Sequence, residues 1–378
     1  MNVLDKIIVK AYNYINTPTS INSSNFYSLV NGWSNNTKRV DDDRLLSDGY
    51  ITNSHVYSII SRISTKGSVI PIDVYEGENL LDSGNAYDVI HPFDISKEDF
   101  IEKSLTSLLG TGDLFYYAPQ VLTMNGNSTV LELLNAGGVT INISSNGIVS
   151  NYSYNDGFTT RKIPTEDILH IKYCDPTLYG LTSKRGLSPL QAAYQTLLAS
   201  NNAQTANAAM LKNGGVKGII SSGGGGDTLG GLQQGQADEL KNAYTDKVGG
   251  PENFNGIHVT RGNIDYTAIG SNPSDLKIIE SGVMDLCSIY GFPSQLLNDP
   301  TGSTFNNQKT AQKSMYEDAI LPPLDKILRD IERFINGRDV VDYSYAINTD
   351  SLLVLQDEKK TEAERGKIVS DTIVGILS

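Results

Sequence analysis

Two short segments contain the residue types that bind phosphate in nucleotide-binding proteins. Residues 223–226 are four consecutive glycines, which follow an apolar run and precede a predicted helix. Thr301-Gly302-Ser303-Thr304 offers hydroxyl groups and a glycine ahead of another predicted helix. The first segment has no G-x-G-x-x-G frame, and the second has neither a Gly-Lys-Ser/Thr triplet nor a leading apolar strand. We therefore interpret 223–226 as a loop tip, while phosphate binding at 301–304 stays compatible with the residues present.

The other reactive side chains form no recognisable catalytic or metal-binding pattern. The four histidines are isolated and lack metal-ligand spacing. His170 lies in the apolar run Ile168–Ile171, which favours a core histidine whose hydrogen bonds are satisfied. The chain contains no G-x-S-x-G or H-E-x-x-H motif and no Cys/His arrangement. We expect no bound metal, no cofactor and no enzymatic activity.

Composition limits the classes of partner. The chain has 378 residues, which is enough for two or three packed modules, and its 39% hydrophobic and 19% charged content suits a folded soluble protein. The net charge of −13 argues against a general basic surface for nucleic acid. If the protein handles DNA, it should therefore hold it loosely, because tight binding needs many contacts from Lys and Arg to phosphate.

The cellular compartment follows from the cysteines and from hydropathy. The two cysteines, Cys174 and Cys287, are far apart in the sequence, which argues against a disulfide framework or a zinc site. So few cysteines suit a reducing compartment. The N-terminal MNVLDKIIVKAY lacks the long apolar core of a signal peptide. No apolar run reaches the ~18 residues of a membrane span. We expect a protein that is cytoplasmic or is assembled in a cytoplasm.

The first half of the chain predicts a mixed α+β module behind a loose arm. Residues 16–45 are rich in Asn, Ser and Thr, so we assign 1–45 to the arm. Alternating runs at Tyr50–Ile63 and Val69–Tyr75 are typical of strands. Residues 113–175 read as a β-meander with Asn-Gly, Gly-Gly and Asp-Gly turns. Ser96 resembles a helix cap, and the helical apolar face behind it, which stops at Gly110, consists of Phe100, Ile101, Leu105, Leu108 and Leu109.

The second half predicts two helices around a small α/β insert. Ser188-Pro189 opens a helix that runs to Gly214, and the insert covers 215–271. Asn272-Pro273 opens the second helix, which Gly291 closes. The apolar face of this second helix consists of Leu276, Ile279, Val283, Leu286 and Tyr290.

A long helical segment follows from Phe305 to Ile335, interrupted at Pro322-Pro323. Residues 340–347 read as a strand, and 351–378 as a mostly helical tail. The long segment has the cleanest amphipathic face of the chain, formed by Leu324, Ile327, Leu328, Ile331, Phe334 and Ile335.

The first of these helices is unusual because it carries no charge. The 26 residues between Arg185 and Lys212 include no Asp, Glu, Lys or Arg, and the second half is almost entirely small or amide residues. A helix facing solvent normally carries charged residues on its outer face. Crowding against other subunits, or exposure to a lumen, explains the pattern. An Ala-rich helix buried within a monomer is the alternative.

The order of three segments resembles the portal proteins of long-tailed double-stranded DNA phages. IPTEDILHIKYCDPTLYGLTSKRGLSPLQAA (163–193) is similar to the passage into the first stem helix of that family. DLKIIESGVMDLCSIYGFPSQLLND (275–299) is similar to its second stem helix, with an aromatic-Pro-x-x-Leu-Leu ending. TFNNQKTAQKSMYEDAILPPLDKILRDIE (304–332) resembles the loop and long helix that follow. The resemblance covers roughly residues 85–355 and rests on order and local pattern.

The resemblance implies a portal fold, which is α+β. Its parts would be an N-terminal arm (1–45), a mixed α/β wing (46–187, completed by 311–350), a first stem helix (188–214), a small α/β clip (215–271), a second stem helix (272–297), a tunnel loop (298–310), a long wing helix with a proline kink (311–335) and a reduced crown (351–378).

The resemblance also implies a function without catalysis. The protein would form a ring, typically of twelve copies, at one vertex of the capsid, with assembly in the host cytoplasm. Double-stranded DNA would enter and leave through its channel. The terminase, the head–tail adaptor and the major capsid protein or scaffold would be its partners, and no membrane would be involved. An acidic subunit suits such a conduit, because negative walls do not trap a sliding polyanion.

Two sets of site residues follow from the resemblance. The tunnel loop would present to DNA the residues Asn298, Asp299, Thr301, Gly302, Ser303, Thr304, Asn306, Asn307, Gln308 and Lys309. The clip would present to terminase or adaptor the residues Gly223, Gly224, Gly225, Gly226, Asp227, Lys247 and Arg261. Another ring-forming connector or adaptor is the nearest alternative function. A nucleotide-binding enzyme built on 223–226 or 301–304 is the other.

Overall fold

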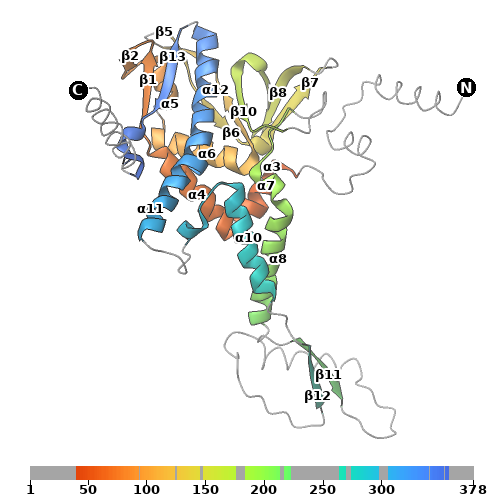
Figure 1. The fold of residues 1–378 in the computed structure, drawn as a ribbon. Coiled ribbons are helices and arrows are strands. Elements are labelled where there is room, and N and C mark those ends of the chain that lie inside the picture. Colours follow the sequence, from red (N-terminus) through yellow and green to blue (C-terminus); the bar gives the residue numbers. More distant parts are fainter. Residues whose placement is uncertain are drawn as a thin grey trace, which may run out of the picture. The chain divides into compact units, whose positions relative to one another are not determined.

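The structure is a computed structural model. It describes residues 40–92, 94–123, 126–144, 148–175, 184–212, 217–222, 264–269, 274–297, 305–339, 341–352 and 354–356. The chain divides into two units: Met1–Ala193 with Ser288–Ser378, and Tyr194–Cys287. Helices combine with small antiparallel sheets, which confirms the predicted α+β class (Figure 1).

The helices of the first unit begin close to the predicted capping residues. In α6, the Ser96 hydroxyl accepts a hydrogen bond from the Asp99 amide, and Gly112 ends the helix in a left-handed conformation, two residues beyond the predicted stop. The helices of this unit are α3 Asp42–Leu45, η1 Leu46–Ile51, α4 Ser54–Ser68, α5 Asn85–Ile90, α6 Lys97–Thr111, η2 Ala136–Gly138, η3 Thr165–Asp167, α7 Pro189–Ala192, η5 Ser294–Leu297, α11 Phe305–Ser314, η6 Met315–Ile320, α12 Leu321–Asp339 and η7 Thr349–Ser351.

The described strands of this unit form four small sheets, with the orders β13-β1-β2, β10-β3-β6, β4-β5 and β7-β8-β9. They are β1 Ile72–Glu76, β2 Asn79–Leu81, β3 Asp113–Tyr117, β4 Gln120–Thr123, β5 Gly126–Thr129, β6 Glu132–Leu134, β7 Val139–Ile143, β8 Val149–Asn155, β9 Thr160–Pro164, β10 Ile168–Lys172 and β13 Tyr343–Ile347.

The predicted strand at Tyr50–Ile63 is wrong, because this segment is helical. Residues 46–51 form η1, a π-helix, and α4 begins after Asn53, whose side chain accepts hydrogen bonds from two backbone amides. Ile59, Ile60 and Ile63 are all fully buried, at the spacing of one helical face. They pack toward α6, which lies between α4 and the strands (Figure 1). Each such side chain contributes roughly 1.5–3 kcal/mol by burial.

The predicted meander is correct only in part. β7, β8 and β9 are consecutive antiparallel neighbours, although β9 was not foreseen. At the start of the predicted meander, β3 and β4 are separated at Ala118-Pro119. β3 pairs with β10, which is far away in the sequence, and with β6. The sheets β10-β3-β6 and β7-β8-β9 share a core that contains Phe115, Leu134, Val139, Tyr152, Ile163 and Ile168.

The long helical segment is interrupted before its prolines. The expected break at Pro322-Pro323 is replaced by η6, a π-helical turn over Met315–Ile320, and both prolines lie in the first turn of α12. Proline has no N–H, so neither residue can donate to the carbonyl four positions back, and the widened turn lies where those bonds are missing. The predicted apolar face is confirmed by the buried Leu324, Ile327, Leu328, Ile331 and Ile335, whereas Phe334 is half-exposed beneath Arg338.

The end of the predicted arm is also corrected. Residues 1–39 lie outside the described part of the chain. Asp42–Leu45 forms α3, however, and the side chains of Asp42 and Leu45 are buried. The folded unit therefore begins before residue 46.

Of the second unit, the structure describes two helices and a β-ribbon. α8 covers Tyr194–Lys212 and α10 covers Ser274–Ile289, and the two lie side by side (Figure 1). Between them, β11 (Lys217–Ser222) pairs with β12 (Ile264–Ile269) in an antiparallel ribbon. A β-carbon placed on Gly282 of α10 would lie 3.6 Å from Ser200 and 3.7 Å from Thr196 of α8, so small residues bring the helices into close contact.

Candidate functional site

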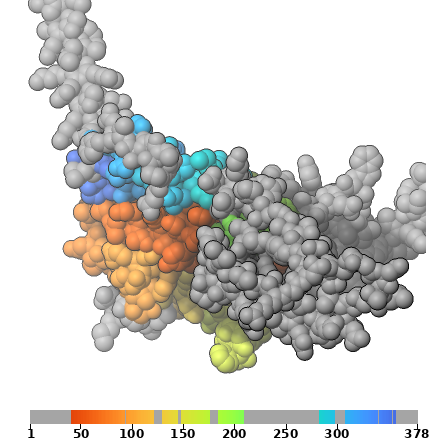
Figure 2. Space-filling view, turned by 90° about the horizontal axis from the view of Figure 1, so that it is seen from below, coloured from red at the N-terminus to blue at the C-terminus, as the bar shows by residue number. Residues whose placement is uncertain are grey.

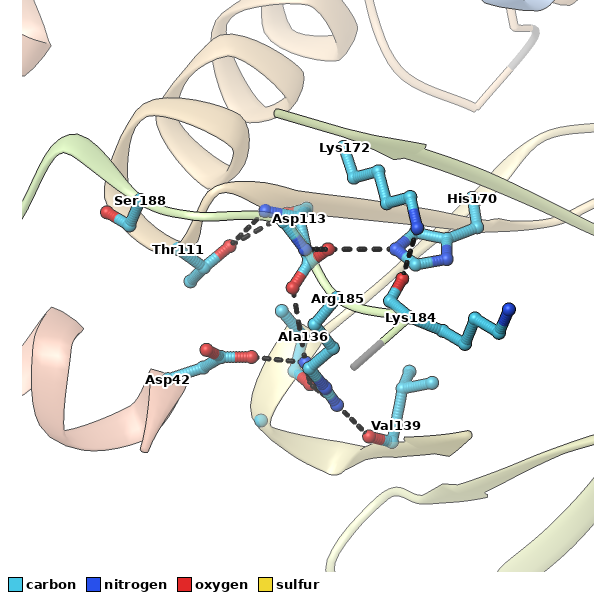
Figure 3. Close-up of polar contacts among 12 residues, drawn as sticks. Asp42, Thr111, Asp113, Ala136, Val139, His170, Lys172, Lys184, Arg185 and Ser188 are labelled. Carbon is cyan, nitrogen blue, oxygen red and sulfur yellow. Dashed lines mark hydrogen bonds and ion pairs between the residues drawn. The ribbon is translucent and has the colours of Figure 1, made fainter. Parts of the chain in front are cut away.

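A buried polar network lies in the first unit where the chain enters α7 (Figure 3). Its centre is Asp113, the first residue of β3, whose side chain is fully buried. One carboxylate oxygen accepts hydrogen bonds from His170 Nε2 at 2.8 Å and from the Gly186 amide at 2.6 Å. A buried carboxylate needs such partners, because an unpaired charge in the interior is very costly. Asp113 therefore holds the strand β10 and the segment before α7 in place.

Arg185 connects this network to the N-terminal part of the unit. Its guanidinium group forms an ion pair with Asp42 of α3 and lies 3.7 Å from the second carboxylate oxygen of Asp113. It also donates to the carbonyls of Ala136 and Val139, and its Cζ atom lies 5.3 Å from the centre of the Phe115 ring. The planar fork of arginine can satisfy several acceptors at once, which lysine cannot. One side chain thus joins α3, η2, β7 and β3.

Two glycines permit the close backbone approach at this junction. Gly112 has a φ of 79°, and a β-carbon there would lie 2.4 Å from the backbone nitrogen of Ser188. A β-carbon on Gly186 would lie 2.1 Å from the Gly112 carbonyl oxygen. Neither clash can be relieved by side-chain rotation, because both contacts involve backbone atoms. Glycine at these positions follows from the packing of the segment before α7 against the end of α6.

The network resembles a catalytic triad in composition but not in arrangement. Ser188 is buried, its hydroxyl donates to the Gly110 carbonyl at 2.8 Å, and it accepts from the Leu190 amide at 3.0 Å as the predicted helix cap. Thr111 donates to the carbonyls of Ser107 and Asp113. Both hydroxyl groups form hydrogen bonds with backbone groups, and neither is hydrogen-bonded to a histidine that could activate it as a nucleophile. The network therefore stabilises the fold.

His170 is the satisfied core histidine that its apolar context predicted. Its ring stacks on Phe115 with centroids 4.1 Å apart, and Nε2 faces Asp113. Burial lowers its pKa below the ordinary value, although the Asp113 carboxylate opposes that shift. The neutral ring with a proton on Nε2 therefore fits the site at neutral pH.

The described residues contain no other group that suggests chemistry. No cluster of three or more His, Cys, Asp or Glu among them could hold a metal ion. Within the same residues, no helix is both long enough and apolar enough to cross a membrane. Cys174 is exposed and Cys287 is buried, and both are free thiols.

The predicted tunnel-loop residues fall into two groups. Asn298, Asp299, Thr301, Gly302, Ser303 and Thr304 lie outside the described residues. Asn306, Asn307, Gln308 and Lys309 do not lie in a loop, because α11 begins at Phe305. Asn307 to Lys309 are exposed in its first turns. The first turn of α11 has no acidic residue, so Lys309 adds a positive charge near the end of the helix that is already positive.

The predicted clip residues all lie between 223 and 263, outside the described residues. Gly223 to Gly226, Asp227, Lys247 and Arg261 therefore stay predictions. Of the insert 215–271, the structure describes only the ribbon of β11 and β12.

Residue types and spacing in the sequence did not predict this network. Asp113 and Arg185 are 72 positions apart, and each looks like an ordinary charged residue at the end of an apolar run. The available local signals were the glycine that follows Arg185 and the polar residue at the start of a strongly apolar strand. Neither signal identifies a partner.

Replacing Gly112 by alanine should destabilise the protein more than replacing Gly77. Both glycines have positive φ, but a β-carbon on Gly77 meets nothing within 4 Å. Gly77→Ala should cost only the roughly 1–2 kcal/mol of the left-handed conformation. Gly112→Ala adds a backbone clash, so its loss in the free energy of unfolding, measured by denaturant titration, should be clearly larger. Equal losses would show that the junction can relax.

Stability should depend on the protonation of His170. The pKa of His170 in the folded protein lies below its unfolded value of about 6.5. The contribution of His170 to the free energy of unfolding is therefore complete above pH 6.5 and declines as the pH falls toward the folded pKa. Between pH 7.5 and 5.5, His170→Gln should lose less unfolding free energy than the wild type, by up to about 1.4 kcal/mol per pH unit. Parallel pH profiles for the two proteins would contradict this.

Comparison with known proteins finds relatives that cover most of the chain. The phage portal protein family matches residues 54–373. A Rickettsia bellii protein described as uncharacterised is 22% identical over 361 residues, covering 89% of this chain and 88% of the relative. A Rickettsia felis protein with the same description is 24% identical over 353 residues, with the same shares covered.

Solved structures share the fold. The neck of an empty gene transfer agent (GTA) particle, computed with C6 symmetry, contains a chain with a TM-score of 0.64 and 20% identity, covering 90% of this chain and 93% of that one. An HK97 family phage portal protein from Corynebacterium diphtheriae has a TM-score of 0.57 and 10% identity, covering 84% and 96%. Because the family match extends over 54–373, the chain belongs to the phage portal protein family.

Proposed function

We propose that copies of this chain assemble into a closed ring, expected to contain twelve, at a capsid vertex of the virion. Double-stranded DNA passes through the ring during packaging and ejection. The ring docks a terminase and later a head–tail adaptor, and it contacts the major capsid protein or scaffold. It has no catalytic step of its own. Two of the GTA structures similar to this chain are necks of particles, one of them computed with C12 symmetry, which supports this assignment.

The observation that carries the proposal is the uncharged outer face of α8. Leu197 and Ser200 are fully buried, whereas Gln195, Ala199, Asn202, Thr205 and Ala206 are exposed in the single chain. An isolated solvent-facing helix would normally carry charges there. Small and amide side chains permit close packing without the cost of burying charge. We infer that neighbouring copies cover this face in the ring.

The overall charge supports a role as a conduit. With a net charge of −13, the subunit offers little long-range attraction to DNA, so a sliding duplex would not be held on the wall. The start of α11 is different, since it combines the positive end of a helix with Lys309. We propose that this end and the adjoining 298–304 make weak, exchangeable contacts with the phosphate backbone.

A charge placed on the exposed face of α8 should weaken ring formation. In Ala206→Glu, a carboxylate would have to be desolvated between copies, which costs more than a surface salt bridge returns. Ala206→Ser keeps the small size without the charge and should assemble normally. Negative-stain images and sedimentation would show closed rings for the wild type and the Ser variant, and smaller species for the Glu variant. Wild-type protein that is folded but forms only monomers or open filaments would refute the ring itself.

Shortening 299–304 should spare assembly but impair DNA handling. These residues precede α11, so their removal leaves the helix intact, unlike a deletion that reaches residue 307. We expect normal rings and a reduced yield of DNA-filled heads in a packaging assay. Lys309→Gln should give a weaker effect in the same direction, because only one charge is removed. A shortened variant that fails to fold would place these residues in the fold rather than at the channel.

A further inference from the structure

We propose that Arg62 of α4 is a positioning residue for the segment 298–304, whose contacts with DNA are proposed above. Its guanidinium group holds the carbonyl of Leu296, two residues before that segment begins. The inference rests on the proposed function and names the side chain that fixes where the segment leaves the fold. Three observations support it: the way the preceding chain is held, the packing of the two flanking elements, and the partners of Arg62.

The chain between α10 and η5 is held against α6 and η6 of the first unit. Tyr290 is buried, and its hydroxyl donates to the carbonyl of Leu109 in α6. Gly291 has a φ of 63°, and a β-carbon there would lie 3.2 Å from the carbonyl oxygen of Asp318 in η6. Phe292 is buried as well. The path of the chain into η5 is therefore set by contacts with two other elements.

Arg62 extends this support to the end of η5. Its Nη1 atom donates to the carbonyl of Leu296, although the two residues are 234 positions apart. The last carbonyls of a helix have no donor within the helix, and a basic side chain can supply one. The last turn of η5 contains no basic residue, so α4 provides the cation instead. Arg62 thus acts as a C-terminal cap from a distant part of the chain.

The elements on both sides of 298–304 pack on one another and on α4. η5 contacts α11, which begins at Phe305. η6, which continues α11, contacts α4. A β-carbon on Gly67 of α4 would lie 3.3 Å from the Ile320 side chain of η6, so these two elements also approach closely. A shift of Leu296 would therefore displace the start of the segment relative to its end. A binding segment whose ends are held in place loses less conformational entropy on contact with its ligand.

The bond to Leu296 is the one interaction of Arg62 within the described part of the chain. The side chain is exposed, and no carboxylate among the described residues pairs with it. Holding an arginine in one geometry costs rotamer freedom, which this bond must offset. Changes at exposed positions usually alter the free energy of unfolding little. The loss of Arg62 should therefore act locally, at η5 and the segment that follows it.

The first test measures hydrogen exchange in the full chain. The Leu296 amide, which donates to the Pro293 carbonyl at 3.0 Å, reports on η5. Arg62→Met keeps the long apolar stem and removes the donors. It should speed exchange of this amide about three- to tenfold, as expected for the loss of one hydrogen bond, while α12 and the melting temperature stay unchanged. Arg62→Lys retains a donor and should restore most of the protection.

The second test measures DNA-filled heads in a packaging assay. Arg62→Met should form normal rings and lower the yield of filled heads about threefold or more, in step with the loss of the anchor. Arg62→Lys should recover most of that yield. Lys66→Met is the matched control, because it removes the same charge from an exposed position one turn along α4 that forms no hydrogen bond or ion pair with described residues. It should change neither the exchange of Leu296 nor the yield.

The outcomes separate the anchor from the function on which it rests. Unchanged exchange of Leu296 in Arg62→Met would overturn the anchor. Faster exchange with a normal yield of filled heads would overturn the positioning role. An equal loss of yield in Lys66→Met would overturn it too, by assigning the effect to the charge of α4. If the proposed function were wrong instead, wild-type protein would form no rings or deletion of 299–304 would leave the yield unchanged, while the exchange of Leu296 would still respond to Arg62→Met.

Discussion

The ion pairs and hydrogen bonds around Asp113 are the interaction on which the first unit depends. A fully buried carboxylate is tolerated only because His170, the Gly186 amide and Arg185 surround it. Removing one partner of such a pair typically costs about 3–5 kcal/mol, because the other charge stays buried. The same contacts bring together α3, β3, β10 and the start of α7. The direction in which the chain enters α7 is therefore set by electrostatics and by the backbone approach at Gly112 and Gly186.

The molecule uses charge differently in different places. Inside the first unit, charges are paired and satisfied by backbone carbonyls. On α8 they are absent before the final residue, Lys212, although several side chains of that helix are exposed in the single chain. At the start of α11, the first turn has no acid and Lys309 follows it, although helices usually place acids near this end. The proposed subunit, which packs against copies of itself and surrounds a polyanion, would account for all three patterns. A soluble monomer accounts only for the first.

Local signals predicted helix ends well and strand pairing poorly. Ser96, Ser188 and Gly291 act as their residue types indicated, because capping depends on atoms within a few positions. The segment Tyr50–Ile63 was misread because its residues satisfy an alternating pattern in part, whereas the buried Ile59, Ile60 and Ile63 follow the helical period. The pairing of β3 with β10 was not predictable from turns, since it joins strands more than fifty positions apart.

The sequence by itself determined the α+β class, the order of the helices around the insert, the caps and the amphipathic face of α12. These properties arise from residue spacing and backbone preference, which act over a few positions. Only the tertiary structure decided that Asp42, Asp113, His170 and Arg185 meet, that Gly112 and Gly186 must be glycines, and that the helical break precedes Pro322. It also showed which apolar residues stay exposed, among them Phe158 and Ile51. Contacts of this kind join residues that are distant in the chain, and a residue's type does not identify its partner.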